Sequence, residues 1–166
     1  MTRHPAFAGQ FYPADPQALK KSILSLAPQQ AAKRERAVAC VLPHAGYTYS
    51  GKVAATTLSQ IDLGDACILL GPNHTGYGTP ASIMTEGEWL TPLGPVSIDR
   101  EIATALIKEC AYLEDDELAH TYEHSLELQL PLIQVLHNQS FTFVPITLAT
   151  NDDLVYKKIA DAIATV

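Results

Sequence analysis

Two short apolar runs, residues 37–43 and 66–72, constrain the fold of this chain most strongly. Each run is bounded by proline or glycine and lacks polar alternation, which is typical of a strand buried on both faces. A histidine in a glycine-bearing loop follows each run, His44 after the first and His74 after the second. Because ligands bind beyond the carboxyl ends of parallel strands, we expect these imidazoles to meet at one rim of a sheet. Neutral imidazole binds zinc, iron and copper, so the pattern predicts a metal site.

The rest of the chain alternates helical patterns with apolar runs. Residues 141–148 predict a third core strand, in which Pro145 should break the hydrogen-bonded ladder. Short strands are expected on both sides of a turn at residues 91–94. Helices are predicted over residues 16–26, 52–61, 100–107, 117–136 and 152–163, where an aspartate cap or an apolar stripe of helical period begins. Pro131 should kink or divide the helix over residues 117–136. The alternation indicates an α/β fold with a mainly parallel sheet and helices on both faces.

The length favours one domain over residues 1–166. The chain stops within or at the end of a helix, where the alternation would place another strand, so we expect a domain that is incomplete at its C-terminus. An incomplete sheet exposes a strand edge, which predicts a homo-oligomer. The aromatic and proline-rich opening segment, residues 3–13, is expected to pack on the body as an ordered arm.

The composition excludes several classes of function. The formal net charge of -7 argues against a nucleic-acid partner, which needs a basic surface. No apolar run is long enough to span a bilayer and no signal-peptide core is present, so we expect a cytoplasmic protein without a membrane partner. The three cysteines form no C-x-x-C pair, and we interpret them as small apolar groups rather than ligands.

A second group of polar residues lies in the predicted helix over residues 117–136. His120 and His124 are four residues apart, as are Glu123 and Glu127, so each pair would share a helix face. The spacing is not the H-E-x-x-H of a zinc protease, and solvent-facing side chains at a polar helix start explain it equally well. Nucleotide-binding loops and a G-x-S-x-G elbow are absent from the sequence.

Taken together, several ordered blocks resemble the Memo family, whose prokaryotic members are called AmmeMemoRadiSam system protein B. The matching stretches are Pro5–Pro13, Pro43–Gly51, Leu70–His74, Thr91–Gly94 with Ile98–Asp99, and Glu123–Glu127 with Leu130–Pro131. The resemblance implies a fold similar to the catalytic subunit of extradiol ring-cleaving dioxygenases, in which two histidines and a carboxylate bind Fe(II). It also implies that His44 and His74 are metal ligands. Memo-like proteins are linked to iron or copper binding, redox chemistry and peptide or partner binding.

The chain departs from that family at the third ligand, because the chain matches only the N-terminal part of the family. Family members continue past residue 166 with the cysteine-bearing segment that supplies this ligand. Either Glu123, His124 or Glu127 completes the site, or the pocket is partial, and we favour a partial pocket. It would bind iron or copper, or a small molecule or peptide, without established turnover. The alternative is a non-haem iron dioxygenase or another metal-dependent redox enzyme, with His124 as its acid/base group. We predict that the following residues line the pocket: Tyr47, Asn73, Glu123 and Glu127.

Overall fold

A four-stranded sheet forms the centre of the molecule, which we describe from a computed structural model that covers residues 1–29, 33–137 and 139–166. The strand order is β4-β9-β5-β8. The strands are β4 (Ala66–Pro72), β9 (Thr142–Leu148), β5 (Ala81–Ile83) and β8 (Glu114–Asp115). β4 and β9 are parallel over their full lengths, β9 and β5 are antiparallel, and β5 and β8 are parallel.

Two smaller sheets flank the central one. The first has the order β1-β6-β7, and the second pairs β2 with β3 in parallel. These strands are β1 (Thr2–Arg3), β6 (Glu88–Thr91), β7 (Gly94–Ser97), β2 (Glu35–Arg36) and β3 (Ile61–Asp62). The short strands predicted around residues 91–94 are therefore confirmed. Gly94 has a φ of 118°, a conformation that glycine adopts without a steric penalty.

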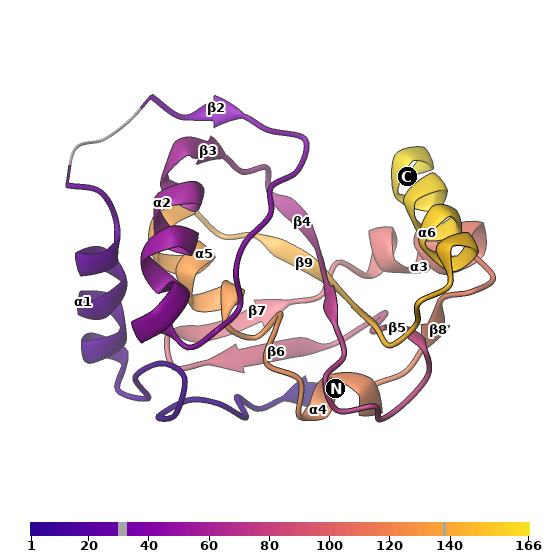
Figure 1. Ribbon diagram of the computed structural model, residues 1–166, viewed down its shortest axis with the longest axis horizontal. Coiled ribbons are helices and arrows are strands. Elements are labelled where there is room, and N and C mark those ends of the chain that lie inside the picture. Colours follow the sequence, from indigo (N-terminus) through magenta and orange to yellow (C-terminus); the bar gives the residue numbers. More distant parts are fainter. Residues whose placement is uncertain (30–32, 138) are drawn as a thin grey trace.

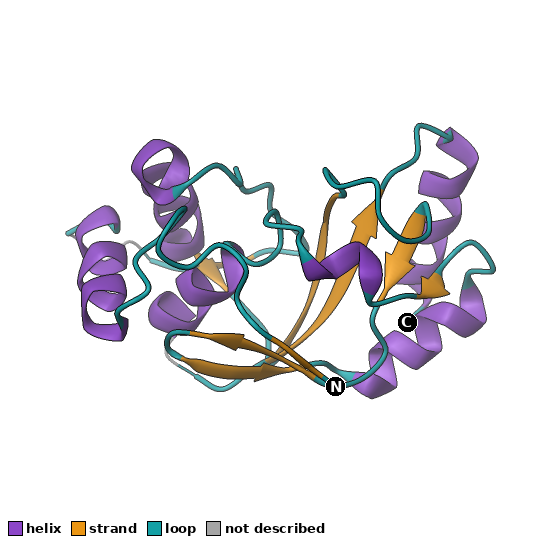
Figure 2. Cartoon of the chain, turned by 90° about the horizontal axis from the view of Figure 1, so that it is seen from below, coloured by secondary structure: helices purple, strands orange, loops and turns teal. Residues whose placement is uncertain are grey.

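Helices cover both faces of the sheet, so the predicted α/β fold is confirmed (Figures 1 and 2). The helices are α1 (Pro16–Leu26), the π-helix η1 (Tyr47–Gly51), α2 (Lys52–Gln60), α3 (Arg100–Glu109), α4 (Leu118–Thr121), α5 (Gln129–His137) and α6 (Asp153–Thr165). One apolar cluster joins α1, α2 and α5, and a second joins α3 and α6 to the sheet. Within the described ranges, no helix is long and apolar enough to cross a membrane.

Three helices begin at the aspartate caps that the sequence predicts. The side chains of Asp15, Asp99 and Asp152 each accept a hydrogen bond from a backbone N–H in the first turn of α1, α3 and α6. Such a cap satisfies a donor that has no partner inside the helix.

Pro145 lies within β9 without ending the strand. On the β4 side it pairs with Leu69, and the parallel register continues past it. On the other side the ladder with β5 stops at the pair Ile83 and Ile146, and the Met84 N–H donates to the Pro145 carbonyl. The expected break is thus confined to the β5 side of β9. The pairing with β5 ends there, so the missing N–H of proline costs no hydrogen bond between the strands.

The prediction of a core strand over residues 37–43 was wrong. Only Glu35 and Arg36 form a strand here, and the residues that follow run as an irregular chain (Figure 1). Val38 and Val41 are fully exposed. The apolar pattern identifies residues suited to a buried strand, but a strand also needs a hydrogen-bonded neighbour, and the described residues provide none for 37–42.

The helix predicted over residues 117–136 is divided, but the division does not lie at Pro131 as expected. It is divided into α4 and α5, with residues 122–128 in turns between them. Pro131 lies in the first turn of α5, where proline is tolerated, and does not kink its interior. As a result His120 and His124 do not share a helix face: His120 is in α4 and fully buried, whereas His124 lies in the turn segment.

Candidate metal centre

Three histidines from three loops meet at one end of the central sheet. His44 precedes η1, His74 follows β4, and His124 lies between α4 and α5. Their ring centroids are 5.3 Å apart for His44 and His74, 5.8 Å for His44 and His124, and 4.5 Å for His74 and His124. One nitrogen from each ring lies within 4.8 Å of the other two. The structure therefore brings together the two strand-end histidines and His124.

The Glu123 side chain contacts this cluster and holds the backbone of the segments that carry His74 and His124. Its side chain is fully buried and accepts hydrogen bonds from the backbone N–H groups of His74, His124 and Ser125. The His74 ring nitrogen Nδ1 is 2.9 Å from Oε1 of the same carboxylate. Burial raises the pKa of Glu123, but the bonds from His74 and Ser125 outweigh it, so that the pKa is lowered overall and the group is ionised.

The bond to Glu123 determines which nitrogen of His74 faces the cluster. Because an ionised carboxylate only accepts, Nδ1 of His74 must donate, and Nε2 is left with its lone pair. Nδ1 of His124 lies farther from the same oxygen, at 3.4 Å, and only the backbone N–H of His124 donates to this carboxylate. This carboxylate–histidine arrangement is the one that orients histidine ligands in metal proteins.

Both His44 and His124 favour the neutral imidazole. Partial burial lowers the pKa of His44, and the neighbouring His74 lowers it further. Burial also lowers the pKa of His124, an effect that Glu123 opposes and the other two histidines reinforce. Neutral imidazole is the form that coordinates a metal ion.

Two aromatic residues of the N-terminal arm form a wall against His124. The Phe7 and Phe11 rings contact the His124 ring edge-on, with centroids 5.4 Å and 5.0 Å away. Sequence reasoning predicted an arm packed on the body but did not place these residues in the site. The density of aromatic residues in the arm was the available signal, although nothing in the sequence indicates which part of the body it packs on.

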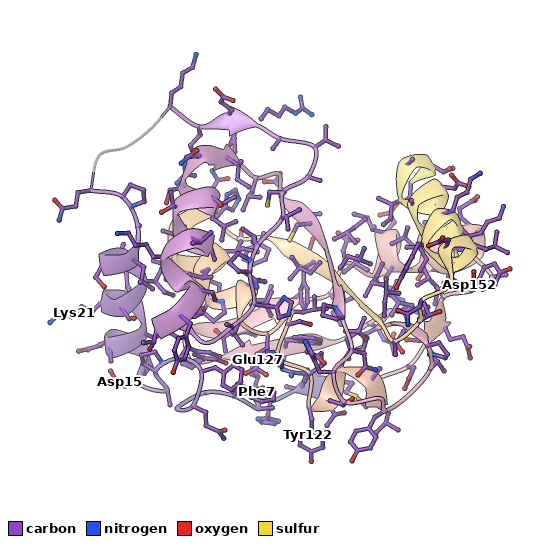
Figure 3. The ribbon with its side chains drawn as sticks, in the orientation of Figure 1. Phe7, Asp15, Lys21, Tyr122, Glu127 and Asp152 are labelled. Atoms are coloured by element: carbon purple, nitrogen blue, oxygen red, sulfur yellow. The ribbon has the colours of Figure 1, made fainter. Side chains whose placement is uncertain are left out.

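Glu127, which the sequence predicts in the pocket, instead anchors this arm. Its buried carboxylate accepts hydrogen bonds from the Arg3 guanidinium at 2.7 Å, the Phe7 N–H at 2.9 Å and the Tyr12 hydroxyl at 2.7 Å. A fourth comes from the Ala6 N–H at 3.0 Å. Figure 3 shows Glu127 beside Phe7. With both oxygens occupied, this carboxylate supports the wall and does not reach the histidines as a ligand.

The two remaining predicted pocket residues hold the loops that carry the histidines. Tyr47 is buried and its hydroxyl donates to the Leu128 carbonyl at 2.7 Å. The Asn73 side chain accepts from the Thr75 N–H and hydroxyl and the Gly76 N–H, and donates to the Tyr77 carbonyl. These hydrogen bonds fix the turn that begins at Asn73 and contains His74.

The sequence is similar to those of one protein family over nearly its whole length. A family model described as Memo-like protein matches residues 3–166. A MEMO1 family protein of Methanopyrus kandleri is 44% identical over an alignment that covers 100% of this chain and 63% of the relative. MEMO1 family proteins of Archaeoglobus fulgidus and Sulfolobus acidocaldarius are 44% and 43% identical over 98% of this chain and 60% and 63% of the relatives, respectively. The chain thus spans less than two thirds of their length, and over that span its sequence shows that it belongs to the Memo-like family.

Proposed function

We propose that this protein binds one transition-metal ion through His44, His74 and His124. The observation that carries the proposal is the convergence of three ring nitrogens within 4.8 Å of one another. Glu123 supports the proposal, because its hydrogen bond to Nδ1 of His74 leaves Nε2 as the nitrogen that can coordinate a metal ion.

The nitrogen separations fit a site that tightens on binding. Zn–N bonds of about 2.0–2.1 Å in a tetrahedral arrangement put neighbouring nitrogens about 3.3–3.4 Å apart. Small rotations of the rings would bring the three histidines to that separation. His44 and His74 are not fully buried, which leaves room for such rotations.

The donor set favours borderline metals over a classical oxygenase iron site. Three imidazoles suit copper, zinc and iron, and the Irving–Williams order ranks Cu(II) highest. A non-haem iron oxygenase uses two histidines and a carboxylate. Glu123, the carboxylate in contact with His74 and His124, already accepts four hydrogen bonds, so we propose His124 as the third ligand.

Three protein ligands leave at least one coordination position for a small molecule. A bound metal would act there as a Lewis acid toward that molecule. Phe7 and Phe11 shield one side of His124 from water, and Glu123 holds the proton of His74 Nδ1 away from the metal-binding nitrogen. We propose ligand binding at this open position as the role of the pocket.

The proposal is tested by calorimetric titration of the untagged protein with Zn(II) and Cu(II). We expect a stoichiometry of one, and a loss of affinity on replacing His44, His74 or His124 with alanine. His4→Ala is the matched control, because His4 is an exposed histidine of the arm. Unchanged binding by the triple variant His44→Ala/His74→Ala/His124→Ala would refute the site.

A further inference from the structure

Gln129, at the start of α5, is a polar residue in an otherwise apolar part of the core. It is 5% exposed, and the nearby Leu128, Leu130 and Leu132 are almost completely buried. Burying an amide costs free energy unless its hydrogen bonds are made. An apolar side chain at this position would avoid that cost, so the amide has to be explained by the groups that it binds.

The Gln129 amide donates two hydrogen bonds, both to backbone carbonyl groups. Its Nε2 lies 3.3 Å from the Pro43 carbonyl oxygen and 3.2 Å from the Ser125 carbonyl oxygen. Because a carbonyl oxygen only accepts, the nitrogen and not the oxygen of the amide must face these two partners. The amide nitrogen carries two hydrogens, so its capacity to donate is used in full.

The oxygen of the same amide has no partner. Oε1 of Gln129 is buried, and none of the described residues donates a hydrogen bond to it. An unsatisfied buried acceptor destabilises a fold, and such a group in a native protein calls for an explanation. The fold therefore bears a cost at Gln129 in order to place the two donors of the amide.

The two carbonyl groups belong to the segments that carry His44 and His124. Pro43 immediately precedes His44, and Ser125 immediately follows His124. The centroids of these two imidazole rings are 5.8 Å apart, which is the widest of the three separations in the cluster. A single amide thus joins the segments of the two histidines that lie farthest from each other.

His44 has little other support on its N-terminal side. Between residues 38 and 44, the bond from Gln129 to the Pro43 carbonyl is the one hydrogen bond found in the described part of the chain. The backbone N–H groups of His74 and His124 both donate to Glu123. Glu123 therefore supports two of the three histidine segments, and the placement of His44 depends on a different residue.

We propose that Gln129 is a positioning residue of the metal centre, which sets the distance of His44 from His124. The role rests on the proposed three-histidine site. The amide bonds the backbone beside each histidine and not the imidazole rings, so it acts through the backbone. Holding both segments before a metal ion arrives reduces the conformational freedom that is lost on binding, and this raises the affinity.

Replacing Gln129 with methionine tests the role, because methionine has a similar length and no amide hydrogens. One Cu(II) should still bind, with a dissociation constant raised about 10–100-fold in calorimetric titrations, as is typical of residues that orient ligands. Gln134→Met is the matched control in the same helix. Gln134 donates to the Gly94 carbonyl at 3.2 Å and accepts from the Thr91 hydroxyl at 2.7 Å. The control variant also loses two hydrogen bonds, but it should bind Cu(II) as the unaltered chain does.

A comparison of double variants separates positioning from a general loss of structure. If Gln129 acts by placing His44, Gln129→Met should hardly change the Cu(II) affinity of the His44→Ala chain. In the His74→Ala chain it should keep its full effect. Cu(II) binds most tightly of the divalent first-row metals, which keeps the weaker variants measurable. An equal loss in both backgrounds, or unchanged affinity of the single variant Gln129→Met, would overturn the proposal.

A measurement on the metal-free protein distinguishes this inference from the metal function. In chelator, NMR relaxation should give a lower backbone order parameter for the His44 amide in Gln129→Met, and no change in Gln134→Met. If the order parameter falls but the unaltered chain binds no Cu(II), the metal site is refuted and the support of His44 by Gln129 is upheld. An unchanged order parameter overturns that support. If Gln129→Met does not fold, Gln129→Asn, whose amide ends one methylene short of both carbonyls, replaces it under the same criteria.

Discussion

At the scale of single residues, Glu123 determines the geometry of the histidine cluster. It accepts hydrogen bonds from the backbone of the three residues His74, His124 and Ser125, and from the His74 ring. A buried carboxylate with four donors is a rigid support, and such outer partners of metal ligands typically matter tenfold to a hundredfold in affinity.

Replacing Glu123 with glutamine should therefore weaken metal binding without removing a ligand. The amide keeps the shape of the side chain but loses the charge that holds the Nδ1 proton of His74. We expect the Zn(II) dissociation constant to rise by about 10–100-fold in calorimetric titrations. Glu117→Gln, at an exposed position, should leave it unchanged. Equal affinities for both variants would mean that Glu123 does not position the ligands.

Residue patterns associated two of the three clustered histidines, whereas His124 was one of three alternatives for the third ligand. His44 and His74 follow apolar runs, and the rule that strand ends share a rim was enough to associate them. His124 lies in a turn, whereas the apolar pattern of the sequence predicts a helix at this position. Glu123 accepts from the N–H groups of the two residues that follow it, a local bond that competes with helix formation and is not visible in the apolar periodicity.

At the scale of elements, the N-terminal arm depends on one buried carboxylate. Glu127 pairs with Arg3 at 2.7 Å, and the side chains of both residues are almost entirely buried. Arg3 also lies over the Trp89 ring at 4.1 Å and donates to the carbonyls of His120 and Glu123. Arg3 of the arm therefore connects the arm to β6 and to the turn that bears His124.

Glu127→Ala should detach the arm and destabilise the fold. It leaves the Arg3 guanidinium buried without its counter-charge, a loss of about 3–5 kcal/mol in the free energy of unfolding. Urea denaturation would measure this loss, and hydrogen exchange should accelerate at Ala6 and Phe7. Glu117→Ala should stay within about 0.5 kcal/mol of the unaltered protein. A loss of under about 1 kcal/mol for Glu127→Ala would contradict the anchoring role.

The elements that local signals define were predicted correctly, and those that depend on distant partners were not. Asp15, Asp99 and Asp152 mark helix starts through bonds to residues two or three positions along the chain, so the sequence contains all of the information. Residues 37–42 carry an equally clear strand pattern. Their conformation depends on a neighbouring strand that no local pattern can supply.

At the scale of the whole molecule, stability should depend on pH through His120. Burial, followed by the charge of the nearby Arg3, lowers the pKa of His120 to about 4. In the unfolded chain the pKa is about 6.5. Between these values the unfolded state binds a proton that the folded state does not, so stability is complete above pH 6.5 and falls as the pH drops toward 4.

Chemical denaturation of the metal-free protein in chelator should show this dependence. Lowering the pH from 7.5 to 5 should cost about 2 kcal/mol through His120 alone. His120→Gln should flatten the profile by that amount, whatever its effect on stability at pH 7.5. His4→Gln should not, because His4 is exposed. Parallel profiles for the unaltered protein and His120→Gln would show that His120 titrates alike in the folded and unfolded states.

The most direct test of the metal centre is X-ray absorption spectroscopy at the zinc edge of the protein loaded with one equivalent of Zn(II). We predict a first shell that contains three imidazole nitrogens at about 2.0–2.1 Å, together with the outer-shell scattering of histidine rings. In His124→Ala the number of imidazoles should fall to two, and in His4→Ala it should stay at three. A shell of oxygen atoms alone, or the same spectrum with and without His124, would contradict the assignment of a three-histidine site.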